Sequence, residues 1–467
     1  MKFRPEAIEI PPENPFQFDL LNRKTVGDSL TEIVRSSSGG LVLALHAPWG
    51  QGKTTFLKMW QQSLINSSAT TIYFNAWQTD FSEDALVSLI GELNSGLKSA
   101  KDGEGTVKLQ ESVASAKKFG AKILRRTVPA LIKLGTAGVL TADDFTEEVV
   151  SGLGEKIAED KIQDYEDAKS SIQGFRSAIE EIAKESSEIE SLPLVIIVDE
   201  LDRCRPTYAI SILECIKHLF SVEGVVFVLS IDRTQLSHAV RSQYGVGMDA
   251  NGYLRRFFDI ELNLPEPSHQ QFIQAQFARF GLLNSFKTRS ATIHSDNEKS
   301  NFTELFLHLF RCMQCSLRDQ ERAFSLLSLA LRATSVNEYL HPDLMAVLIV
   351  LKIKDTDSYE KFVNGVMPPD AILDRLAEGP GGREFIATQD GVIVEAVLRA
   401  SVCPSAERES LHAHYRDLAN GVTSQASCDK SRATEILRLF SIREIHPVFG
   451  RLKRISSKID LAISMQA

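Results

Sequence analysis

Hydrophobic and polar positions follow two alternating patterns over the first 270 residues. Short apolar or β-branched runs are typical of buried strands, and they occur at Leu41–Leu45, Thr71–Phe74, Leu194–Val198, Val225–Leu229 and Asp259–Leu264. Between them lie segments with helical spacing: after Pro206, which suits a first helical turn, apolar residues from Ile210 to Phe220 share one face. Because the strands are too far apart for hairpins, the pattern predicts crossover connections, a parallel sheet and an α/β domain.

The spacing of the strands also predicts how the chain is divided. A charged segment rich in Ala, Lys and Glu separates the second strand from the third, and we expect it to form a helical insertion at about 82–190 within a domain spanning 1–270. Beyond that domain the apolar residues recur at helical spacing, which predicts a lid-like helical subdomain at 271–378 and a helical C-terminal region at 379–467. Polar residues 287–301 and 379–382 are predicted to be loops.

The strongest chemical signal is the segment APWGQGKT at residues 47–54, which follows a predicted strand and opens a helix. A phosphate-binding loop requires this context, because glycines let several N–H groups point at one phosphate and the helix N-terminus adds positive charge. Lys53 is predicted to bind the outer phosphates, and the Thr54 hydroxyl to ligate Mg²⁺. Ala47 stands where the fingerprint has its first glycine. The predicted nucleotide-binding residues are Pro48, Trp49, Gly50, Gln51, Gly52, Lys53, Thr54 and Thr55.

A second signal is the pair of acids that ends the third predicted strand. A carboxylate at this position lies beside a phosphate loop in a sheet of this type, so Asp199 is predicted to hold Mg²⁺ directly or through water. The adjacent Glu200 is predicted to polarise a water for in-line attack on the γ-phosphate. Two neighbouring acids at the end of a buried strand are costly unless a cation or solvent compensates them. The alternative is a strand that simply reaches solvent.

Four segments in order resemble the KAP family of P-loop NTPases, which includes bacterial phage-exclusion proteins and animal membrane-scaffold proteins. They are WGQGKT at 49–54, FNAW at 74–77, VDELDRC at 198–204 and YLRRF at 253–257, and the resemblance covers roughly residues 14–270. It implies a five-stranded parallel sheet with an additional strand between the phosphate loop and the acidic strand. It also implies ATP as the nucleotide, Asp199 on magnesium and Glu200 as general base. Many members carry membrane-spanning hairpins in the insertion, and no such span is evident here by length.

Further residues are candidates for the reaction. Ser230 and Asp232 end the fourth strand, where resemblance to sensor positions favours contact with the γ-phosphate or the attacking water. A helix N-cap is the alternative for Asp232. Asn75 ends the second strand and is a further candidate for contact with the water, whereas Trp77 is expected in the core.

An arginine is expected to complete the charge of the transition state, because its planar guanidinium stays charged and binds phosphate oxygens at two points. The candidates are Arg203, Arg255, Arg256 and Arg318, and the alternative for each is a solvated surface charge. We assign Arg256 and Asp232 catalytic roles alongside Lys53, Asp199 and Glu200.

Composition limits the setting and the partners. The formal net charge is −9, which provides no chain-wide basic surface for nucleic acid, and six cysteines in 467 residues indicate a reduced, cytoplasmic protein rather than a disulfide framework. Cys312 and Cys315 have the spacing of metal ligands, but no second pair of cysteines or histidines follows them at zinc-ribbon distance. We therefore expect buried free thiols. The basic amphipathic stretch 117–133 suggests peripheral membrane contact or a partner helix, with a solvated face as the commoner explanation.

These observations favour an ATP-hydrolysing conformational switch that self-associates or recruits an effector protein. A role in antiviral defence follows only from the family analogy. The alternatives are a nucleotide-dependent scaffold with little turnover, a DNA-associated ATPase and a P-loop kinase.

Overall fold

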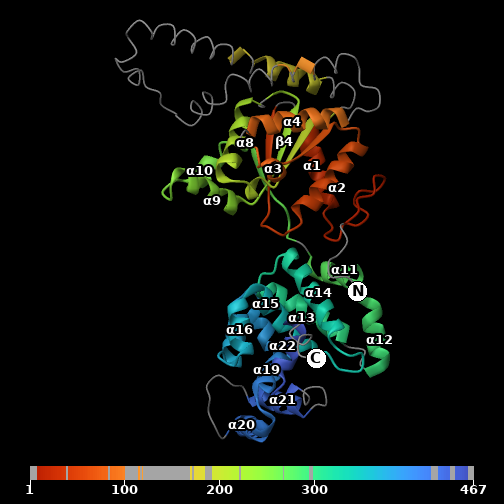
Figure 1. Cartoon of the computed structure of the whole chain (residues 1–467), viewed down its shortest axis with the longest axis vertical. Coiled ribbons are helices and arrows are strands. Elements are labelled where there is room, and N and C mark those ends of the chain that lie inside the picture. Colours follow the sequence, from red (N-terminus) through yellow and green to blue (C-terminus); the bar gives the residue numbers. More distant parts are fainter. Residues whose placement is uncertain are drawn as a thin grey trace. The chain divides into compact units, whose positions relative to one another are not determined.

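The computed structural model describes residues 8–37, 40–82, 85–99, 114–115, 118, 169–170, 173–184, 192–219, 222–266, 268–293, 298–421, 430–441 and 448–460. These residues form two compact units, of which the first is Ile8–Glu266 and the second includes Pro267–Ala467 (Figure 1).

The first unit is built on a five-stranded sheet in the order β2-β3-β4-β1-β5, and every pair of neighbouring strands is parallel. The strands are β1 (Leu41–His46), β2 (Thr71–Asn75), β3 (Leu194–Asp199), β4 (Val225–Ile231) and β5 (Ile260–Asn263). The predicted α/β fold is therefore confirmed, and β4 is the additional strand between the phosphate loop after β1 and the acids after β3.

Burial along the strands explains this order. Every residue of the central strands β3 and β4 is buried, as expected when helices cover both faces of a parallel sheet. In β5 half-buried residues alternate with exposed ones, which fits its position at the edge. The register places Asn75 beside Asp199 and Leu45 beside Ser230, so the polar strand ends gather at one edge of the sheet.

Helices cover both faces of the sheet. Leu43 and Leu45 of β1 pack with α1 and α2, whereas Val42 and Ala44 belong to the core formed with α4, α8, α9 and α10. The sheet therefore forms the middle layer of three, with helices on both sides of it (Figure 1). The helical elements of the unit are α1 (Lys24–Ser36), α2 (Lys53–Asn66), α3 (Ala76–Thr79), α4 (Ala85–Ser99), the 3-10 turn η3 (Leu201–Arg203), α8 (Pro206–Leu219), α9 (Arg233–Tyr244) and α10 (Ala250–Leu254).

The helical insertion follows β2, as predicted. Helix α4 and residues 173–184 are its main described parts, and Phe175, Ile179 and Ile182 are buried against the sheet core. The basic stretch 117–133 lies outside the described residues except for Lys118. Within the part of the chain that the structure describes, no helix has the length and apolarity needed to cross a membrane.

The second unit is helical throughout its described residues and has one hydrophobic core, which extends from Ile273 to Ile459. Nine of the ten residues from Pro342 to Leu351, all except Asp343, are buried in the middle helix α15. The elements are α11 (His269–Arg279), α12 (Leu283–Ile293), α13 (Glu298–Cys312), α14 (Leu317–Arg332), α15 (Pro342–Lys354), α16 (Thr356–Val363), α17 (Pro369–Ala377), α18 (Gly382–Ala387), α19 (Gln389–Val402), η4 (Ser405–Glu407), α20 (Arg408–Asn420), α21 (Lys430–Phe440) and α22 (Leu452–Asp460).

The prediction of a loop at 287–301 is wrong, because helices α12 and α13 occupy most of that segment. Its polarity reflects a buried ion pair: Arg289 Nε lies 2.9 Å from Glu298 Oε2, and both side chains are almost completely buried. A buried pair of charges can be accommodated when its hydrogen bonds are satisfied, and Arg289 also donates to the backbone oxygens of Ser335 and Glu338. The predicted division of this unit between residues 378 and 379 stays a prediction.

Candidate nucleotide-binding site

The loop between β1 and α2 has the backbone conformation that a phosphate site requires. Gly50 and Gly52 have φ angles of +79° and +77°, in the left-handed region that favours glycine. Gly52 is the N-cap of α2, and no side chain caps this helix, so its first N–H groups remain available to an anion. Thr54 and Thr55 are half-buried in the first turn, whereas Pro48 and Trp49 are exposed.

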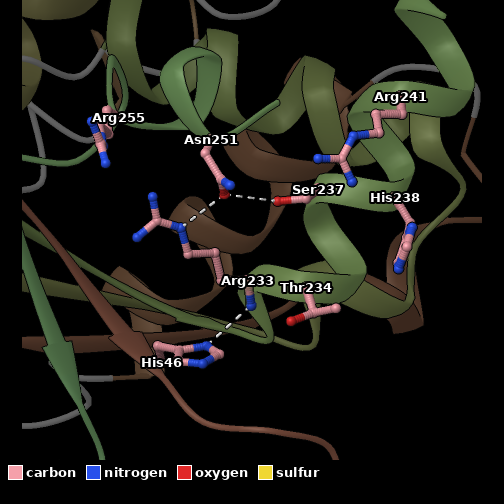
Figure 2. Close-up of a pocket in the computed structure, with 8 residues that line it drawn as sticks. All are labelled: His46, Arg233, Thr234, Ser237, His238, Arg241, Asn251 and Arg255. Atoms are coloured by element: carbon pink, nitrogen blue, oxygen red, sulfur yellow. Dashed lines mark hydrogen bonds between the residues drawn. The ribbon is translucent and has the colours of Figure 1, made fainter. Parts of the chain in front are cut away.

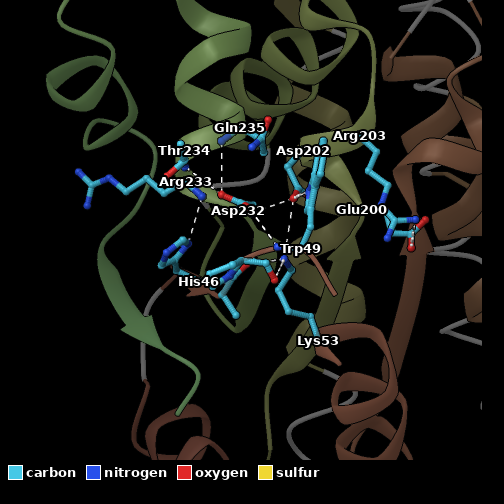
Figure 3. Close-up of polar contacts among 12 residues, drawn as sticks. His46, Trp49, Lys53, Glu200, Asp202, Arg203, Asp232, Arg233, Thr234 and Gln235 are labelled. Carbon is cyan, nitrogen blue, oxygen red and sulfur yellow. Dashed lines mark hydrogen bonds and ion pairs between the residues drawn. The ribbon is translucent and has the colours of Figure 1, made fainter. Parts of the chain in front are cut away.

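Lys53 is a buried cation surrounded by acids (Figure 3). Its ammonium donates to the Ala47 carbonyl at 2.5 Å and lies 3.8 Å from Oδ2 of Asp202. Burial lowers the pKa of Lys53, and the negative charges of Asp202, Asp232 and Asp199 oppose this shift. The structure thus brings Lys53 and Asp199 into one electrostatic cluster, as the sequence predicted for a phosphate site.

Asp199 is fully buried at the end of β3. Its Oδ1 accepts the backbone N–H of Glu200 at 2.9 Å, and its Oδ2 accepts the hydroxyl of Tyr73 at 2.7 Å. Burial, together with the neighbouring Asp199 carboxylate, raises the pKa of Tyr73, so this phenol keeps its proton and orients the carboxylate. Sequence reasoning missed Tyr73, although its place on β2 beside the acidic strand is a usable signal.

Glu200 has a strained backbone and a fixed side chain. Its φ is +60°, in the left-handed region that a residue with a Cβ rarely adopts. Its carboxylate pairs with Arg203 at 2.9 Å, and the Arg203 guanidinium lies over the Trp77 ring, 5.7 Å from the centroid. Trp77 is 54% exposed, so the expectation that it packs in the core is wrong: it provides a surface on which Arg203 stacks.

Asp202 is a third acid of the site and was not predicted as one. The turn η3 returns the chain to the sheet edge, and Oδ2 of Asp202 accepts hydrogen bonds from the Trp49 indole and from the Asp232 backbone N–H (Figure 3). Burial raises the pKa of Asp202, and the Lys53 charge opposes the shift. The spacing from Asp199 to Asp202 was the available signal, because one tight turn returns to the same edge.

The end of β4 contributes two polar residues. Oδ1 of Asp232 accepts N–H groups of Thr234 and Gln235 and so caps α9, while its Oδ2 accepts the Trp49 N–H of the phosphate loop at 3.1 Å. A catalytic role for Asp232 stays a prediction. Ser230 is completely buried, and its Oγ has no hydrogen-bond partner among the described residues. Asn75 caps α3 by accepting from the Gln78 N–H.

Arg23 connects the phosphate loop to the segment after β5 and was not predicted. Its Nη1 donates to the Gln51 carbonyl at 2.8 Å, and its Nη2 to the Pro265 carbonyl at 3.0 Å. The side chain is buried, which lowers the pKa of Arg23 to about 10 and still leaves it charged near neutral pH. Nothing in the local sequence distinguishes it, because these contacts span 28 and 242 residues.

The other candidate arginines are placed differently. Arg256 and Arg255 follow α10, are exposed and make no ion pair within the described part of the chain, while Arg318 is exposed at the start of α14 in the second unit. Cys312 and Cys315 are buried, and burial raises the pKa of both thiols, that of Cys315 to about 12. Among the described residues no group of acids, cysteines and histidines is arranged to hold a metal ion by itself.

The sheet order, the glycine-containing loop before α2 and the acids after β3 define a P-loop NTPase fold with an additional central strand. Residues 23–330, more than half of the chain, match the KAP family P-loop domain. The chain therefore belongs to the KAP family of P-loop NTPases.

Two solved structures align with most of the chain at low sequence identity. The solved structures of the Aeropyrum pernix ORC2 protein include one with ADPNP and ADP, which is 12% identical, covers 97% of both chains and has a TM-score of 0.29. The ADP form is 10% identical, covers 99% of this chain and 97% of that one, and also has a TM-score of 0.29. No curated protein matches the chain.

Proposed function

We propose that the protein binds ATP with Mg²⁺ at the loop before α2 and hydrolyses it. The observation that supports this most is the position of Lys53: a buried ammonium, next to an uncapped helix N-terminus and three aspartates. The ammonium can bind the phosphates of a nucleotide, and the nearby acids can bind the divalent cation that accompanies it.

The residues present fit both groups. Mg²⁺ prefers hard oxygen ligands, and the Thr54 hydroxyl and the Asp199 carboxylate are such donors. When bound, magnesium would neutralise charge on the phosphates. The unpartnered, buried Ser230 Oγ is a polar atom that a phosphate oxygen or the attacking water can satisfy.

Glu200 is the proposed general base. Its carboxylate is held by the ion pair with Arg203, and its strained φ fixes the direction in which the side chain leaves the strand. Lys53 would stabilise charge on the outer phosphates, and Asp232 would hold the loop through the Trp49 N–H. Arg256, which is exposed and without an ion-pair partner in the described residues, is the proposed arginine for the transition state.

Nucleotide turnover would operate a conformational switch. Arg23 donates hydrogen bonds both to the phosphate loop and to Pro265, which lies just before the boundary between the two units. A change in the conformation of the loop can therefore move the segment that connects the units. Self-association or recruitment of an effector protein, in an anti-phage defence system, is the role we propose for this switch on family analogy.

Calorimetric titration with Mg-ATP tests the binding site. We expect the wild-type chain to bind and Lys53→Ala to lose about tenfold or more in affinity, because a charge-assisted contact to phosphate is lost. Lys217→Ala, at an exposed lysine of α8, is the matched control and should bind as the wild type does. Equal heats for Lys53→Ala and wild type, with both proteins folded by circular dichroism, would place the nucleotide elsewhere.

A further inference from the structure

A basic pocket lies on the first unit, next to the phosphate loop but on the other face of β1. Its volume is about 460 Å³, within the size range of small-molecule sites, and it opens between α9, α10 and the end of β1. Figure 2 shows Arg255 and Arg241 on either side of Asn251, with His46 and Thr234 nearer the sheet. The lining residues are His46, Arg233, Thr234, Ser237, His238, Arg241, Asn251 and Arg255.

The charges of this pocket are incompletely compensated. Arg233 pairs with Glu261 at 2.6 Å and also donates to Asn251 Oδ1. Arg241 and Arg255 make no ion pair within the described part of the chain, although the protein has a net charge of −9 and acids are plentiful. No acidic side chain lines the pocket. Two uncompensated guanidinium groups that face one cavity repel each other, and an anion between them removes that repulsion.

The polar groups of the wall are arranged as donors. Asn251 Oδ1 accepts from Ser237 Oγ and from Arg233, which leaves the Asn251 amide nitrogen as a donor. His46 Nδ1 accepts the Arg233 backbone N–H, so the other ring nitrogen carries the proton. The Thr234 hydroxyl has no hydrogen-bond partner among the described residues. Guanidinium, amide and hydroxyl donors around a concave site are the groups that bind phosphate oxygens.

This pocket is distinct from the nucleotide site. Side chains alternate along β1, so Leu45 faces the core with α2, and His46 points to the opposite face, where α9 and α10 lie. The two sites are nevertheless connected, because Asp232, which accepts the Trp49 N–H of the phosphate loop, directly precedes Arg233 of the pocket.

We propose that this pocket binds a small molecule carrying more than one phosphate group, and that Arg241 and Arg255 are its principal ligands. Single-stranded nucleic acid has phosphates too, but the limited volume of the pocket and the lack of an aromatic side chain on which bases could stack favour a small ligand.

Pyrophosphate binding by the full chain tests this proposal. The titration is made on Lys53→Ala, so that the phosphate loop contributes least, and in magnesium-free buffer. Adding Arg241→Gln or Arg255→Gln should weaken pyrophosphate binding by about tenfold. Adding Arg383→Gln, at an exposed arginine of α18, should leave it unchanged.

The Arg255→Gln variant provides a test even if Arg241→Gln affects folding. Arg255 is exposed, so its substitution leaves the core of the unit intact. Pyrophosphate affinity that is the same in all four proteins would overturn the proposal. So would an oligonucleotide that binds through Arg241 and Arg255, with steep salt dependence, where pyrophosphate does not. Neither result depends on whether the phosphate loop binds ATP.

Discussion

The ammonium of Lys53 lies 3.8 Å from Oδ2 of Asp202, and both side chains are buried. The same oxygen accepts hydrogen bonds from the Trp49 indole and from the backbone of Asp232. Asp202 therefore joins the phosphate loop, the acidic turn and the end of β4. Among the acids around the buried Lys53 charge, Asp202 forms the ion pair, so removing it leaves that charge less compensated, which is costly in a buried site.

We expect Asp202→Ala to lower the free energy of unfolding by about 3–5 kcal/mol, the range observed when one partner of a buried pair is removed. Mg-ATP should recover part of this loss, because its phosphates provide Lys53 with negative charge. Thermal melting with and without Mg-ATP measures both effects. Asp28→Ala removes an exposed pair with Lys24 and should cost little. Melting of Asp202→Ala like that control would contradict the structural role of Asp202.

The bridge made by Arg23 predicts a difference between arginine and lysine. Its guanidinium reaches the carbonyls of Gln51 and Pro265 at once, which a single ammonium cannot do with the same geometry. Arg23→Lys should therefore weaken Mg-ATP binding about tenfold, as measured by calorimetry, through misplacement of the loop. Arg35→Lys, at an exposed position of α1, the helix that Arg23 precedes, is the control. If Arg23→Lys binds Mg-ATP with wild-type affinity, the two hydrogen bonds of Arg23 do not position the loop for binding.

The buried imidazole of His341 predicts that stability falls with acidification. Burial, helped by the charges of Lys458 and Arg451 and opposed by Glu338, lowers the pKa of His341 to about 4. Because the folded pKa lies below the unfolded value of about 6.5, protonation favours unfolding, and stability is lost as the pH falls from 6.5 towards 4. The free energy of unfolding should drop by about 2 kcal/mol between pH 7 and pH 5.

Urea unfolding of wild type and His341→Asn at these two pH values makes the comparison. Asparagine suits the position, because His341 has a φ of +53°, in the left-handed region that asparagine tolerates. The range above pH 5 also avoids the titration of Glu338, whose pKa is lowered by its contacts with Lys458. An equal drop in both proteins would show that His341 does not cause it.

The main features of the first unit could be predicted because they are local in sequence. Five apolar runs, a loop with two glycines and a lysine, and two acids after a buried strand each occupy fewer than ten residues, and they predicted the strands, the phosphate loop and the acidic edge. Backbone geometry at Gly50 and Gly52 follows directly from those residue types.

The contacts that were missed join segments distant in sequence. Tyr73 reaches Asp199 across 126 residues, and Asp202 reaches the Trp49 indole across 153. Trp77 is expected in the core from the sequence, yet in α3 it is exposed beside Arg203. Likewise, the polar composition of 287–301 concealed a buried ion pair between Arg289 and Glu298, which only the packing of α12 against α13 brings together.

Single-turnover hydrolysis of Mg-ATP by wild type and by Glu200→Gln tests the central claim most directly. Glutamine keeps the size and polarity of the side chain but cannot accept a proton from the attacking water. We predict that Glu200→Gln binds Mg-ATP with wild-type affinity and releases phosphate about 100-fold more slowly or not at all. Equal rates of phosphate release by the two proteins, or no hydrolysis by the wild type, would contradict the proposed site.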